Sequence, residues 1–180
     1  VVITARPDLV VADLVTEAVR AGARTLGLAT GSSPLAAYAE LIRRYREEGL
    51  SFAAVTAVLL DEYAGLPPEH PQSYARFIRE HFTDHVDIGA VHSPDAMAVD
   101  LLQSAAAYDE LIAGLGPVAV QILGIGANGH LGFNEPSSSL TSRTQVSTLT
   151  RRTRDDNARF FGPGEEVPGL AITQGLGTIC

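Results

Sequence analysis

The turn at residues 124–136, Gly-Ile-Gly-Ala-Asn-Gly-His-Leu-Gly-Phe-Asn-Glu-Pro, holds the most reactive combination of side chains in the sequence. An amide, an imidazole and a carboxylate stand close together at Asn128, His130 and Glu135. Imidazole and carboxylate groups transfer protons near neutral pH. Glycines let the backbone turn tightly and leave room for a ligand. We therefore predict that His130 and Glu135 form a proton relay.

Two other interpretations of this turn are weaker. Residues 124–129 match Gly-x-Gly-x-x-Gly, the fingerprint of dinucleotide-binding sites. That fingerprint needs a helix directly after it and an acid about 20 residues later. Pro136 argues against the helix, and residues 147–150 read Ser-Thr-Leu-Thr, so we reject a nicotinamide cofactor. His130 and Glu135 form no recognised ligand set, so we expect no metal.

A second polar turn, Thr30-Gly31-Ser32-Ser33, lies between an apolar strand and the start of a helix. Its backbone N–H groups, its hydroxyls and the helix dipole favour a phosphate group. An ordinary turn in which Ser33 caps the helix fits the sequence equally well.

A third polar turn begins with Asp61, directly after the apolar residues 57–60. A carboxylate at the mouth of a buried strand is partly desolvated, which raises its basicity. Such a base suits abstraction of a carbon-bound proton next to a carbonyl. Taken alone, a helix cap or a surface acid explains Asp61 slightly better.

All 13 basic residues are arginine, and no lysine is present. Schiff-base catalysis through a lysine of this chain is therefore excluded. A cationic side chain that holds an anion must be arginine. Among Arg151, Arg152, Arg154 and Arg159, we expect Arg159, beside two phenylalanines, to face inward and the others to lie on a solvated helix face.

Bulk properties narrow the class of protein. With 180 residues, 46% of them hydrophobic, one domain with a real core is expected. The net charge of -8 argues against nucleic acid as the main partner, and no apolar run is long enough for a membrane span. The single cysteine, Cys180, excludes an intrachain disulfide and fits the reducing cytoplasm. Oligomeric state is left open.

Apolar patterning predicts alternating strands and helices. The expected strands are residues 1–4, 25–29, 52–60 and 118–125; the expected helices are 8–20 (capped by Asp8), 34–48, 73–82, 100–115 and 151–161, with another apolar element from 167. This alternation predicts an α/β, three-layer Rossmann-like fold with a mostly parallel sheet flanked by helices. Ligands bind at the carboxyl ends of such strands, where all three polar turns fall.

These motifs together resemble glucosamine-6-phosphate deaminases. The resemblance rests on residues 60–66 (Leu-Asp-Glu-Tyr-Ala-Gly-Leu) and 126–136, with support from segments 29–34, 70–74 and 157–161, in the family's order and over essentially the whole chain. It implies conversion of glucosamine 6-phosphate and water to fructose 6-phosphate and ammonia, without an organic cofactor.

The resemblance also implies residue roles. His130 would open the pyranose ring, held by Asn128 and Glu135, and Asp61 would move a proton from C2 to C1. The turn 30–33 and Arg159 would hold the 6-phosphate. Residues 145–172 resemble the family's mobile lid.

Three departures from the family pattern matter. Asn128 stands where many members carry aspartate, so the relay has one less charge. Gln145 and Ser147 replace basic residues of the allosterically activated members, so we expect no activation by an acetylated sugar phosphate. The single domain, residues 1–180, ends before the family's usual C-terminal part, which supplies further strands and a phosphate-binding lysine.

Rival functions remain open. A 6-phosphogluconolactonase shares the fold and a related Gly-His turn, although its turn usually continues differently from residues 133–136. A galactosamine-6-phosphate deaminase is hardly separable by sequence. A non-catalytic sugar-phosphate-binding module is the alternative outside enzymes.

Overall fold

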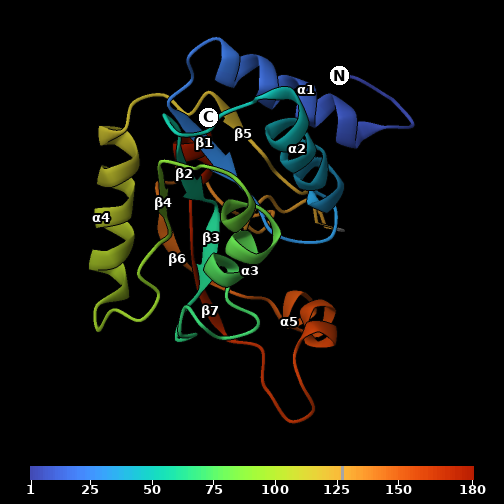
Figure 1. The fold of residues 1–180 in the computed structure, drawn as a ribbon. Helices are drawn as coiled ribbons and strands as arrows, with labels where there is room; N and C mark the ends of the chain where they lie inside the picture. The colour runs from blue at the N-terminus through green and yellow to red at the C-terminus, as the bar shows by residue number, and fades with distance from the viewer. Residues whose placement is uncertain (127) are drawn as a thin grey trace.

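The computed structural model describes residues 1–126 and 128–180 (Figure 1). The helices are α1 Pro7–Arg20, α2 Leu35–Glu48, α3 Tyr74–His81, α4 Leu101–Gly114, α5 Arg151–Asn157 and α6 Leu176–Ile179, with 3-10 turns η1 Thr83–His85 and η2 Ala158–Phe160. The strands are β1 Thr25–Leu28, β2 Thr56–Leu59, β3 Asp61–Tyr63, β4 Ala90–His92, β5 Val120–Gln121, β6 Gln145–Thr148 and β7 Leu170–Thr173. No helix in these residues is long and apolar enough to cross a membrane.

The main sheet has the strand order β4-β2-β1-β5, and every neighbouring pair is parallel. Alternate residues of β2 face opposite layers: Ala57 and Leu59 pack with α1, α2 and α3, whereas Val58 packs with α4. Figure 1 shows α4 on one side of the strands and α1 and α2 on the other. This confirms the predicted three-layer α/β arrangement.

A second, antiparallel sheet of order β3-β7-β6 was not predicted. Gln174, just after β7, fastens it to the main sheet: its backbone N–H donates to Leu60 O and its Nε2 donates to Leu59 O, both at 2.9 Å. The strand β3 therefore continues β2 after a change of direction, which sets Asp61 at the junction of the two sheets.

Two predictions near the N-terminus were wrong. Residues 1–4 form no strand and are exposed. Asp8 does not cap α1, because the helix begins at Pro7, a residue suited to a first helical position. Asp8 instead lies in the first turn, where its Oδ2 is 2.7 Å from Nη2 of Arg6.

Two strands are shorter than their apolar runs predicted. Only Thr56–Leu59 of residues 52–60 is a strand; Phe52 and Val55 are buried in the turn before it. Only Val120–Gln121 of residues 118–125 pairs with β1, and both residues are half-buried rather than buried. Within the described residues, β5 lies at one edge of the main sheet, so β1 is its single neighbouring strand.

Candidate functional site

The three polar segments and part of the segment around α5 line one cavity of about 340 Å³. The segment that begins with Asp61, predicted as a turn, forms the strand β3. The lining comes from residues 29–33 after β1, residues 60, 61 and 63 at the sheet junction, residues 71–74 and 77 around α3, residues 124–126, 130, 132 and 133 after β5, and residues 157 and 159–161. A volume of this size suits a small-molecule ligand. The predicted convergence at the carboxyl ends of β1, β2 and β5 is therefore found in the fold.

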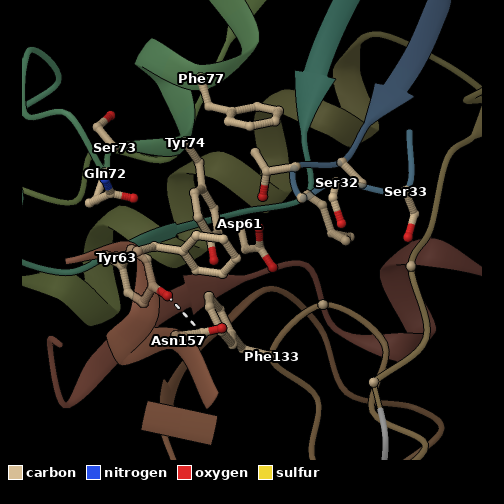
Figure 2. A pocket seen from close by; sticks show the side chains of 18 of the residues that line it. Ser32, Ser33, Asp61, Tyr63, Gln72, Ser73, Tyr74, Phe77, Phe133 and Asn157 are labelled. Carbon is tan, nitrogen blue, oxygen red and sulfur yellow. Dashed lines mark hydrogen bonds between the residues drawn. The ribbon is translucent and has the colours of Figure 1, made fainter. Parts of the chain in front are cut away.

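Asp61 is 6% exposed and points into the cavity (Figure 2). Its carboxylate makes no hydrogen bond to any residue that the structure describes. Burial, with a smaller contribution from the charge of Glu62, raises the pKa of Asp61 to about 8. The geometry thus provides a carboxylate that is a far stronger base than an exposed aspartate.

Glu62, in contrast to Asp61, accepts several hydrogen bonds through its carboxylate. No role was predicted for this residue from the sequence. Its Oε1 accepts hydrogen bonds from the backbone N–H groups of Tyr63 (2.9 Å) and Tyr74 (3.0 Å). Its Oε2 accepts from Ser73 Oγ (2.8 Å) and the backbone N–H of Ala75 (2.9 Å). Because adjacent strand residues face opposite ways, Glu62 ties the start of α3 to β3 while Asp61 faces the cavity.

Asn128, His130 and Glu135 are connected, but only His130 lines the cavity. Asn128 donates from Nδ2 to Glu135 Oε2 (2.8 Å) and accepts at Oδ1 from the backbone N–H of His130 (3.2 Å). The Nδ1 atom of His130 is buried and has no hydrogen-bond partner among the described residues. Asn128 therefore links Glu135 to the backbone of His130 rather than to its ring. The predicted proton relay between the His130 and Glu135 side chains is not found among the described contacts, because the hydrogen bonds of Glu135 go to Asn128 and Thr153.

Glu135 is also held by the helix α5. Thr153 Oγ1 donates to Glu135 Oε1 at 2.7 Å. Burial acts to raise the pKa of Glu135, but hydrogen bonds from Thr153 and Asn128 outweigh it, so the pKa of Glu135 is lowered. The ionised carboxylate is the form these donors stabilise. Sequence reasoning missed Thr153, because nothing in the pattern of α5 marks it as a contact of residue 135.

The turn at residues 30–33 is open to solvent on the cavity side. Gly31 has a φ of 102°, in the left-handed region that favours glycine. Ser32 and Ser33 are exposed (Figure 2). Ser33 is not the helix cap, since Pro34 occupies that position and no side chain accepts a hydrogen bond there. The hydroxyls are thus free of the capping role that the alternative interpretation gave them.

Arg159 lines the cavity from η2, but it is exposed rather than buried, so the prediction that it faces inward is met only at the cavity rim. Its Cζ lies 4.7 Å from the centroid of the Phe160 ring, a cation–π contact that orients the guanidinium. No acidic side chain in the described part of the chain pairs with it, whereas Arg151 and Arg152 face Asp155 and Asp156 along the exposed helix. Arg159 is therefore available to an anionic ligand.

An aromatic wall closes the cavity near Asp61. The ring of Tyr63 lies 4.8 Å from Tyr74, 5.4 Å from Phe133 and 5.7 Å from Phe161, centroid to centroid. Asn157 Nδ2 donates to Tyr63 Oη at 2.8 Å (Figure 2). Burial raises the pKa of Tyr63 to about 12, so its hydroxyl stays neutral. The position of Tyr63 directly after the acidic pair was a signal that could have been used.

Across residues 1–126 and 128–180, no group of three or more His, Cys, Asp or Glu side chains is placed to hold a metal ion. The chemistry that these residues offer is acid–base: a basic carboxylate, an imidazole, and a turn of N–H and hydroxyl groups with an arginine, all lining one small cavity.

Comparison with known proteins gives consistent matches. The family model described as glucosamine-6-phosphate isomerases/6-phosphogluconolactonase matches residues 3–157. A glucosamine-6-phosphate deaminase of Rhodococcus opacus (strain B4) is 58% identical over 171 residues, 94% of this chain and 66% of the relative. One of Corynebacterium kroppenstedtii is 56% identical over 174 residues, 96% of this chain and 67% of the relative. The chain thus spans about two thirds of these relatives.

Solved structures agree with this. A monomeric glucosamine-6-phosphate deaminase superimposes with a TM-score of 0.91 at 41% identity, covering 96% of this chain and 73% of that one. A 6-phosphogluconolactonase from Trypanosoma cruzi superimposes with a TM-score of 0.70 at 20% identity, covering 97% of this chain and 72% of that one. At that identity the second match shows a shared fold alone.

Proposed function

We propose that this chain, which belongs to the glucosamine-6-phosphate isomerase/6-phosphogluconolactonase family, converts glucosamine 6-phosphate and water to fructose 6-phosphate and ammonia. The observation that carries the proposal is the convergence of Asp61, His130, Arg159 and the turn 30–33 on one cavity. We assign the reaction to amino-sugar catabolism in the cytoplasm.

In the proposed complex, the 6-phosphate binds at one end of the cavity. The backbone N–H groups of residues 30–33 and the hydroxyls of Ser32 and Ser33 donate to its oxygens, and Arg159 supplies a charge-assisted pair. This contact places the sugar carbons toward the sheet junction, where Asp61 lies.

His130 opens the ring by transferring a proton between the C1 hydroxyl and the ring oxygen, which leaves an aldehyde at C1. Glu135 and Asn128 hold the backbone of His130 in place during this step. Asp61 then removes the proton from C2, and the electron pair forms the C1–C2 double bond of an enolamine. The π pair of the C1 carbonyl moves to its oxygen at the same time, and this oxygen takes a proton from water.

The protonated Asp61 returns the proton to C1, which gives a ketimine at C2. Water adds to the imine carbon, the C–N bond breaks, and ammonia leaves with fructose 6-phosphate as the product. Every proton in the sequence is carried by Asp61, His130 or water, so no metal or organic cofactor is required by the proposal.

Lactone hydrolysis by a 6-phosphogluconolactonase is the second candidate, favoured by the shared fold and the family description. That reaction needs no base to remove a carbon-bound proton, and a basic carboxylate would serve there only to activate water. The relatives named glucosamine-6-phosphate deaminase, at 56% and 58% identity against 20% for the lactonase structure, favour deamination.

The test is a substrate comparison on the full-length polypeptide. Ammonia release from glucosamine 6-phosphate is expected, with no hydrolysis of 6-phosphogluconolactone above the spontaneous rate. Galactosamine 6-phosphate, run in parallel, defines the preference at C4. Lactone hydrolysis without ammonia release would contradict the proposal. Binding of the sugar phosphate without turnover would also contradict it and would indicate a sugar-phosphate sensor instead of an enzyme.

A further inference from the structure

One face of α5 contacts Glu135, which is linked to His130, and Tyr63, which lines the cavity near Asp61. Thr153 and Asn157, four residues apart, lie on the same side of the helix. Thr153 donates to Glu135 at 2.7 Å, and Asn157 donates to Tyr63 at 2.8 Å. The helix is thus hydrogen-bonded to Glu135, which Asn128 links to the backbone of His130. It is also hydrogen-bonded to the strand β3, which carries Asp61.

The link from Thr153 to His130 is continuous. Thr153 is 4% exposed, and its hydroxyl contacts Oε1 of Glu135. The other oxygen, Oε2, accepts from Asn128, and Asn128 accepts from the backbone N–H of His130. Four residues therefore connect the buried face of α5 to the imidazole-bearing turn by three hydrogen bonds.

The direction of each bond is fixed by its neighbours. Glu135 accepts from an amide on one oxygen, and an ionised carboxylate only accepts, so Thr153 must donate its one hydroxyl proton to the other. The hydroxyls of Thr153 and Thr150 are 2.9 Å apart, so Thr150 must donate to Thr153. Thr150 Oγ1 accepts in turn from the backbone N–H of Thr153 at 3.2 Å. This chain of donors requires a hydroxyl at residue 153.

We propose that Thr153 is a positioning residue for His130, because its hydroxyl fixes Glu135 and, through Asn128, the turn that presents His130 to the cavity. The role of His130 in turnover rests on the proposed function, but the bond from Thr153 to Glu135 does not. Thr153 lies outside the cavity lining, so it acts through Glu135 and not on the substrate.

Two substitutions at residue 153 separate the hydroxyl from the shape of the side chain. Thr153→Val keeps the branched shape and removes the donor, whereas Thr153→Ser keeps the donor. In the full-length protein, Thr153→Val is expected to lower kcat by roughly 10-fold or more and to change KM by less than about 3-fold, since a hydrogen bond to a charged group is lost. Thr153→Ser is expected to stay within about 3-fold of wild type in both.

A control substitution on the exposed side of α5 tests whether a less stable helix lowers kcat as much as Thr153→Val does. Arg152→Gly weakens the helix and touches neither Glu135 nor the cavity. It is expected to retain kcat within about 3-fold. A fall in kcat equal to that of Thr153→Val, or a Thr153→Ser variant as slow as the valine variant, would overturn the positioning role.

A second measurement needs no turnover. The carboxyl carbon of Glu135, assigned with Glu135→Gln, is followed by NMR as the pH falls. Thr153→Val should raise the pKa of Glu135, because one donor that stabilises the ionised carboxylate is lost. Arg152→Gly should leave it unchanged. Among the described residues, His130 is the titratable neighbour whose charge acts on Glu135, so its titration is recorded in the same samples.

The two proposals fail in distinguishable ways. If the wild-type protein releases no ammonia but Thr153→Val raises the pKa of Glu135, the deaminase assignment is rejected and the contact between Thr153 and Glu135 stands. If wild type releases ammonia while Thr153→Val alters neither kcat nor the titration of Glu135, the inference about Thr153 is rejected and the deaminase assignment stands.

Discussion

Asp61 and Glu62 are consecutive buried carboxylates with opposite hydrogen-bonding environments. Glu62 accepts four hydrogen bonds, three from backbone N–H groups and one from Ser73, and stabilises the start of α3. Asp61 accepts none within the described part of the chain and faces the cavity. Burial without a hydrogen-bond donor favours the protonated form of Asp61. One residue therefore holds the local structure while its neighbour is kept basic.

The raised pKa of Asp61 predicts the pH dependence of the reaction. The proposed base acts in its ionised form, and in the free protein half of it is ionised near pH 8. We expect kcat/KM to fall about tenfold for each pH unit below that value, because kcat/KM reports groups of the free enzyme. Steady-state rates between pH 5 and 9 measure this. A kcat/KM that stays flat from pH 8 down to pH 5 would exclude a base of this pKa.

The same shift has a consequence for stability. The carboxyl of Asp61 titrates near 3.8 in the unfolded chain and near 8 in the folded one, so between these values the unfolded state loses its proton first. Stability is therefore expected to decrease as the pH rises from about 4 to about 8. Denaturant unfolding at several pH values measures this, and Asp61→Asn should remove that part of the slope.

Gly126 has no room for a side chain beside His130. A Cβ built at residue 126 would collide with the imidazole ring of His130. Gly126→Ala should therefore displace the ring and lower kcat by roughly 100-fold, the loss that a misplaced catalytic group can cause. Gly114→Ala, at a position where a Cβ meets open space, is the matched control in steady-state assays. Wild-type kcat in Gly126→Ala would show that the position of His130 is not critical.

Arg159 should contribute mainly to phosphate binding. Loss of its charged hydrogen bonds, about 1.5–3 kcal/mol, corresponds to a roughly 10- to 100-fold weaker affinity for the sugar phosphate. Calorimetric titration of Arg159→Ala with glucosamine 6-phosphate measures this. Arg154→Ala is the control, since Arg154 lies exposed on α5 and outside the cavity lining. Equal losses in the two variants would indicate a general charge effect instead of a contact.

Local signals made much of the fold predictable. Ser73 caps α3 by accepting from the backbone N–H of Arg76, and Asp100 caps α4 by accepting from those of Leu102 and Gln103, as side chains of these types do. The site could be placed because parallel strands end at a common edge, so polar turns after β1, β2 and β5 had to meet. Neither inference needed knowledge of contacts between distant segments.

The features that were not predicted from the sequence depend on contacts between distant segments of the chain. The antiparallel sheet consists of strands of three or four residues that pair across long stretches of chain, and so short a segment carries little pattern of its own. The four donors around Glu62 and the hydroxyl of Thr153 at Glu135 are set by where α3 and α5 come to lie. The half-exposed β5 likewise reflects its place at the end of the sheet.

The central claim is that Asp61 moves the C2 proton of a sugar held by the turn 30–33 and Arg159. The most direct test is the rate of ammonia release by Asp61→Asn at a glucosamine 6-phosphate concentration that saturates the variant by calorimetry. The side chain keeps its shape and loses its basicity, so we predict a fall of at least roughly 1000-fold with the sugar phosphate still bound. A rate within a few-fold of wild type would contradict this role for Asp61.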